Sequence, residues 1–153
     1  MISLMPGISH RVSDDDRAFL ASFEACAVAP PDFNHREHVR LAYVCLCEEG
    51  GPAAAHARVR AALLGFIRHN GVPEAKYHDT ITQAWVLAVD YFMQKAAPAP
   101  FESFDAFITS DPRLLDSSIM LTHYSKDRLF SESARSAFIE PDLAPIPRRR
   151  IDE

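Results

Sequence analysis

The chain has 153 residues, 48% hydrophobic and 24% charged, a composition typical of one globular domain that excludes a disordered or fibrous protein. The net charge is −5, and acidic residues follow the single basic run at 148–150, so we expect no nucleic-acid partner. No apolar run reaches the roughly 20 residues that a membrane helix needs, and the N-terminus lacks a signal-peptide pattern. Three cysteines form no even disulfide framework and suit a reducing compartment, so we expect a cytoplasmic protein.

Helix start and stop signals divide the first half of the chain. Ser13 is a suitable N-cap for a helix whose first turn holds three aspartates. Asn34 is a suitable N-cap for a second helix from about His35 to Glu49, with Glu37 as its reciprocal capping partner. An alanine-rich third helix ends at a strong C-terminal signal, Asn70–Gly71.

The second half contains the longest predicted helix, from Pro73 to Lys95, with apolar residues at 81, 85, 88 and 92. Shorter helices are predicted within 101–110, 111–125 and 131–139. Residues 1–12 are expected to be flexible, and residues 141–153 to be extended on the surface. The pattern predicts a single-domain all-α helical bundle of about six or seven helices spanning residues 1–153, with no internal repeat.

Histidines are placed near several of the predicted helix ends. In "FNHREHVRLAY", His35 and His38 are three residues apart and therefore share one face of a helix. His78 lies near the start of the long helix, and His123 lies near the end of a later one. Helix ends in a small bundle gather at one rim or the other, so we expect His35, His38 and His78 to open onto one cavity.

Neutral imidazole is the commonest metal-ligating side chain, and helical bundles build metal sites from neighbouring helices. We therefore expect His35, His38 and His78 to bind a divalent metal, zinc or iron, with Asp79 as the fourth ligand or as a partner that orients an imidazole. The HxxH spacing alone is common, and it differs from the zinc motif HExxH, in which the histidines are four apart and a glutamate follows the first.

Further residues complete the expected site. The candidate catalytic residues are His78, His123 and Tyr124, and the candidate substrate-binding residues are Tyr77, Thr82, Trp85 and Arg135. Arg135 stands among small residues and could clamp a substrate carboxylate, with an internal ion pair as the alternative. Cys45 and Cys47 point to nearly opposite sides of a helix and cannot share a metal, so they are interpreted as core residues.

Three segments carry a resemblance: "FNHREHVRLAY", "KYHDTITQAW" and "RLFSESARSAFIEPDLAPIP". With their F-x-H-x-x-H and Y-H-x-T-x-T motifs, they resemble a group of small uncharacterised bacterial all-α proteins over roughly residues 33–147. The resemblance implies no activity and no catalytic residue.

Three functions remain open. The first is a metal-dependent enzyme, hydrolytic or oxygen-using, that acts on a small-molecule substrate. The second is a metal-free lyase, isomerase or hydrolase with a histidine base. The third is a non-catalytic module for small-molecule binding or assembly, and a homodimer is left open. Purely structural roles for the histidines are the alternative to all three.

Overall fold

Seven α-helices and four short 3-10 helices make up the part of the chain that the computed structural model describes, residues 10–95 and 100–148. The α-helices are α1 (Asp14–Glu24), α2 (His35–Glu49), α3 (Pro52–His69), α4 (Asp79–Lys95), α5 (Phe104–Ser110), α6 (Lys126–Leu129) and α7 (Glu132–Ser136). The 3-10 helices are η1 (Pro30–Asp32), η2 (Glu74–Lys76), η3 (Pro112–Leu115) and η4 (Ser117–Thr122). These residues contain no strand, which confirms the predicted all-α single-domain fold.

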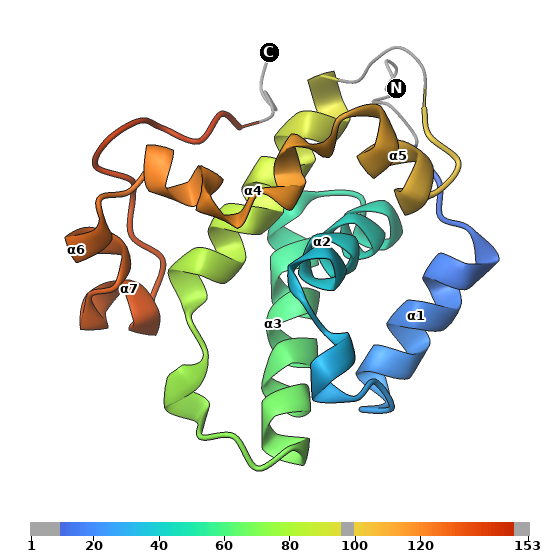
Figure 1. Cartoon of the computed structure of the whole chain (residues 1–153), viewed down its shortest axis with the longest axis horizontal. Coiled ribbons are helices and arrows are strands. Elements are labelled where there is room, and N and C mark those ends of the chain that lie inside the picture. Colours follow the sequence, from blue (N-terminus) through green and yellow to red (C-terminus); the bar gives the residue numbers. More distant parts are fainter. Residues whose placement is uncertain (1–9, 96–99, 149–153) are drawn as a thin grey trace.

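Helix α2 lies in the middle of the molecule (Figure 1). It packs against α1, α3, α4 and α5, while α7 packs on α4. All six residues from 41 to 46 are buried, so the centre of α2 is surrounded by protein on every side. The first turn of α2, which carries His35 and His38, is more accessible.

The predicted caps explain most helix boundaries. Ser13 caps α1 in a capping box that Asp16 completes. The Asn34 side chain accepts a hydrogen bond from the Arg36 backbone and caps α2, and the left-handed Gly50 (φ 82°) ends that helix. Glu37 does not act as the predicted reciprocal partner: one of its carboxylate oxygens is buried without a hydrogen-bond partner in the described chain, and the other lies 3.7 Å from Arg36.

The predicted helix from Pro73 to Lys95 is wrong at its start. Residues 74–76 form η2, the chain is extended at Tyr77, and α4 begins at Asp79. The predicted helix over 111–125 is also replaced by the two 3-10 helices η3 and η4, and the last helix ends at Ser136. The short helix α6 was not predicted as a separate element.

Residues 10–12, predicted to be flexible, are packed in the fold. His10 is 8% exposed; its Nε2 lies 2.7 Å from the Met93 carbonyl, and its Nδ1 accepts a hydrogen bond from the Phe101 backbone. Val12 joins the core. Residues 1–9 and 149–153, which complete the predicted flexible and extended ends, lie outside the described residues, and residues 141–148 are irregular with Ile146 buried.

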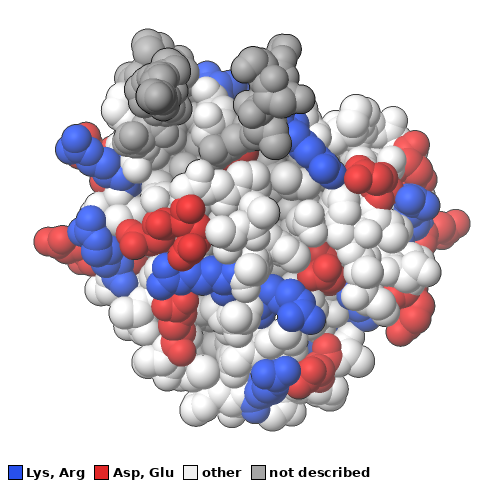
Figure 2. Space-filling view, turned by 180° about the vertical axis from the view of Figure 1, so that it is seen from behind, with Lys and Arg blue, Asp and Glu red and all other residues white. Residues whose placement is uncertain are grey.

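Acidic and basic side chains are interspersed on the face that Figure 2 shows, with uncharged surface between them. A short row of basic side chains crosses the middle of that face, with acidic side chains on either side of it. Within the same described ranges, no helix combines the length and the apolar character needed to cross a membrane.

Candidate functional site

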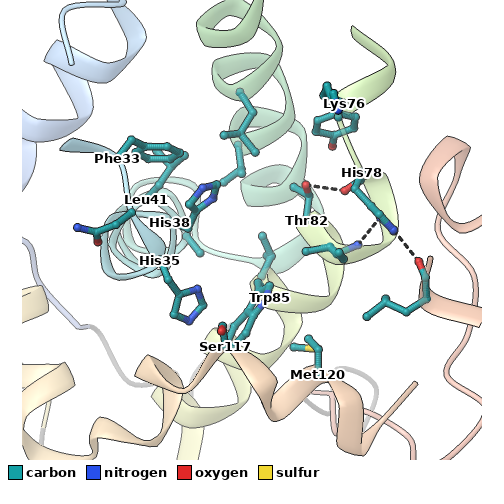
Figure 3. Close-up of a pocket in the computed structure, with 18 of the residues that line it drawn as sticks. Phe33, His35, His38, Leu41, Lys76, His78, Thr82, Trp85, Ser117 and Met120 are labelled. Carbon is teal, nitrogen blue, oxygen red and sulfur yellow. Dashed lines mark hydrogen bonds between the residues drawn. The ribbon is translucent and has the colours of Figure 1, made fainter. Parts of the chain in front are cut away.

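A cavity of about 690 Å³ opens between α2, α3, α4 and η4. Its volume is within the range of small-molecule sites in proteins. Most of its lining is apolar, and its described apolar and aromatic residues are Phe33, Leu41, Ala42, Val59, Leu63, Ile67, Tyr77, Ile81, Trp85, Val86, Met120, Leu121, Leu129 and Phe130. The polar lining consists of Asn34, His35, His38, Lys76, His78, Thr82, Ser117 and Ser118. The three histidines predicted to open onto one cavity therefore do so (Figure 3).

His35 is anchored by the protein. Its Nε2 donates a hydrogen bond to the Leu114 carbonyl at 2.9 Å, because a carbonyl oxygen can only accept. Its ring meets the edge of Trp85 at a centroid distance of 4.6 Å. One nitrogen of His35 is therefore committed to the fold, and in the neutral ring Nδ1 is left as the acceptor.

His38, one turn further along α2, has both ring nitrogens uncommitted among the described residues. Its ring packs on Phe33 at a centroid distance of 4.1 Å and borders the cavity. Surrounding protein and the neighbouring His35 lower the pKa of His38 to about 4. His38 is nevertheless exposed to solvent through the open cavity, and screening by water makes this shift smaller without reversing its direction. At neutral pH His38 is thus a neutral imidazole that can accept a proton.

His78 forms the N-cap of α4, which explains why the helix begins at Asp79. The backbone N–H of Ile81 donates to Nδ1 at 3.1 Å, so the proton lies on Nε2, which donates to the Leu129 carbonyl at 2.6 Å. Burial lowers the pKa of His78 and outweighs the opposing effect of the Leu129 hydrogen bond. Both nitrogens bind backbone groups, so neither is available for a metal or as a base in this arrangement.

Asp79 faces a different group of side chains. Its Oδ1 accepts hydrogen bonds from the Tyr77 hydroxyl at 2.7 Å and from His56 Nε2 at 3.2 Å, and Arg60 Nε lies 3.8 Å away. Burial and the bond to Asp79 raise the pKa of Tyr77, which keeps the phenol neutral. Asp79 does not line the cavity, although Tyr77 does.

The predicted metal-ligand set is therefore not assembled. No group of three or more histidine, cysteine, aspartate or glutamate side chains is placed to hold a metal ion in residues 10–95 and 100–148. With His78 and Asp79 committed elsewhere, His35 and His38 leave two imidazoles, whereas a catalytic zinc has three protein ligands. Binding of zinc or iron stays a prediction.

Other predicted site residues divide between the cavity and its surroundings. Thr82 lines the cavity while its hydroxyl donates to the His78 carbonyl at 2.8 Å, and Trp85 forms one wall. His123 and Tyr124 lie outside the lining and hold the C-terminal segment, His123 through Ala144 and Tyr124 through Ile139. These hydrogen bonds to backbone carbonyls indicate a structural role for both residues.

Arg135 also lies outside the cavity lining. It is half-buried on α7, and its charge contributes to lowering the pKa of His78. The internal ion pair considered as its alternative is not found among the described residues. Arg135 is therefore close to the His78 region without reaching the cavity wall.

Sequence reasoning missed several residues of the wall. Phe33, Ser117 and Met120 come from segments interpreted as connector or as one regular helix, and Lys76 lies on the unpredicted turn η2. Phe130, 55% exposed at the edge of the cavity, follows the unpredicted α6. Phe33 could have been predicted as part of the wall, because it is an aromatic residue two positions before His35 in the sequence.

Comparison of the chain with protein-family models, curated proteins and solved structures gives no match.

Proposed function

We propose that the chain binds an apolar small molecule in this cavity and that His38 acts on it as a general base, without a metal ion. The observation that carries the proposal is the state of His38. It is a neutral imidazole on the wall of a large apolar cavity, and no described residue occupies its nitrogens. His35 and His78, by contrast, are held by the backbone carbonyls of Leu114 and Leu129.

A base in this position has two properties that support catalysis. Its neutral form persists to acidic pH, so the acceptor lone pair is present throughout the physiological range, while the same lowered pKa makes His38 a weaker base than an ordinary histidine. The surrounding apolar side chains cover the apolar part of a bound molecule, which favours its binding beside the imidazole. The reaction class that follows is proton abstraction from a bound molecule, or from a water molecule beside it.

Diethyl pyrocarbonate, which acylates neutral imidazole, tests the protonation state of His38. The modification rate of each histidine is measured by mass spectrometry at pH 7.5 and pH 5.5, with a histidine peptide as reference. The peptide rate should fall about tenfold, because its pKa is about 6.5. The rate at His38 should fall less than twofold. A tenfold fall at His38 would contradict the proposed base.

The fluorescent probe N-phenyl-1-naphthylamine tests the cavity in the same assay. Saturating probe should protect His38 from modification and leave His69, which is exposed at the end of α3, unprotected. Equal rates at His38 with and without a bound probe would contradict its placement in the binding site.

The metal-dependent alternative is tested on the same protein. Elemental analysis after purification without chelator, followed by zinc titration of wild type and His38→Ala, distinguishes it from the base mechanism. Stoichiometric zinc that is lost in His38→Ala would favour the metal. Base chemistry predicts no dependence of zinc uptake on His38.

A further inference from the structure

The charge of the cavity lining differs from that of the whole chain. The chain has 21 acidic and 16 basic residues, yet the described lining contains no aspartate or glutamate and one lysine, Lys76. A cationic ligand would find no carboxylate there. The formal charge that the described wall offers a ligand is therefore positive.

Lys76, at the end of η2, lines the cavity and is exposed to solvent, so it lies at the opening. Figure 3 shows it on the segment just before His78. The acidic residues nearest to it in sequence are engaged by other groups. Glu74 is bound by Arg68, and Asp79 accepts from Tyr77 and His56. The Lys76 ammonium has no ion-pair partner among the residues that the structure describes.

The rest of the lining limits the charge of the ligand. Phe33, Trp85 and Met120 present apolar surface, and burying a second charge against it would carry a desolvation cost with no compensating cation. One ammonium at the opening matches one negative charge, and its long flexible stem lets it follow the position of that charge.

We propose that the ligand of the cavity is an apolar monocarboxylate. Its carboxylate pairs with Lys76 at the opening, and its apolar body lies against Phe33, Trp85 and Met120 within reach of His38. This inference rests on the proposed function, because it names the class of molecule that the same cavity binds.

The test compares decanoate with decanol, which share a chain length and differ in charge. Each competes with N-phenyl-1-naphthylamine at pH 8 against wild type, Lys76→Gln and a matched control, Lys126→Gln, at an exposed lysine outside the cavity lining. Lys76→Gln should weaken decanoate binding about fivefold, the effect of losing an accessible ion pair, and should change decanol binding less than twofold. Lys126→Gln should change neither, and Lys76→Arg should retain decanoate affinity.

The outcomes separate this inference from the proposed function. Equal decanoate affinity in wild type and Lys76→Gln, with intact probe binding, overturns the carboxylate ligand and leaves the cavity as a binding site. No probe binding to folded wild type overturns both. A parallel loss of decanoate and decanol binding in Lys76→Gln overturns the charge argument, since it assigns Lys76 a role in shaping the cavity.

Discussion

Asp16 is a buried carboxylate that joins three parts of the chain. It accepts hydrogen bonds from the backbone of Ser13 at 3.1 Å and of Phe104 at 2.9 Å, and from Arg40 Nε at 3.0 Å. Burial alone would raise the pKa of Asp16, but these hydrogen bonds together lower it. The residue thus connects the start of α1 to α2 and to the start of α5.

The lowered pKa makes this connection sensitive to acid. The unfolded chain binds the Asp16 proton more tightly, so the stabilisation is complete above the ordinary pKa of 3.8 and is lost as pH falls through the folded-state value. Asp16→Asn should lower the free energy of unfolding by about 1–3 kcal/mol at pH 7 and by less at pH 3, measured by urea denaturation. Asp15→Asn, at an exposed position of the same helix, is the control. An Asp16→Asn loss that is equal at both pH values would contradict the assignment.

His78 is expected to stabilise the fold through its two backbone bonds. His78→Ala removes the cap of α4 and leaves the Leu129 carbonyl without its donor, which should cost about 2–3 kcal/mol in thermal or urea unfolding. His78→Asn can restore the cap without reaching Leu129 and should cost less. His69→Ala, at an exposed site, should change stability by less than about 0.5 kcal/mol. An unchanged stability in His78→Ala would show that the cap is dispensable.

At the scale of the elements, two glycines have opposite roles in α2 and α3. Gly50 ends α2 with φ 82°, a conformation that a side chain disfavours, whereas Gly65 lies inside α3 with open space where a Cβ would be. Gly50→Ala should lower the free energy of unfolding by about 1 kcal/mol, and Gly65→Ala should raise it by about 0.5–1 kcal/mol. Urea denaturation of this matched pair checks both signs. A destabilising Gly65→Ala would mean that α3 does not tolerate a side chain at this position.

Helix boundaries set by local chemistry were predictable from sequence. Ser13 and Asn34 cap their helices through the next few residues, so a short window contains the whole interaction. The start of α4 was not predictable in this way, because histidine is an unusual cap and His78 is fixed by Leu129, 51 residues away. Asp111 and Asp116 each cap a 3-10 helix, and this pair was an available signal against one continuous helix over 111–125.

The candidate site was predictable only in part for the same reason. Helical spacing places His35 and His38 on one face, and both line the cavity. Which histidine nitrogen binds which carbonyl depends on contacts between distant segments, as in the bond from His35 to Leu114. The pairing of Asp79 with His56 is likewise a contact between helices that spacing along one helix does not encode.

At the scale of the whole molecule, the single tryptophan reports on the cavity. Trp85 lines its wall and is partly accessible. Bound decanol should shield the indole, so the acrylamide quenching constant of tryptophan fluorescence should fall when decanol is added. Protein unfolded in urea is the control and should show no change. An unaltered quenching constant at saturating decanol would place the ligand elsewhere.

The buried centre of α2 has a consequence for the exchange of amide hydrogens with solvent. Residues 41–46 are covered on all sides, whereas α6 and α7 are short and largely exposed. Deuterium should therefore enter α6 and α7 through local opening, while the amides of residues 41–46 should exchange only when the whole molecule unfolds. Mass spectrometry of peptides from α2 should then give an opening free energy equal to the global free energy of unfolding, so one segment measures the stability of the entire chain.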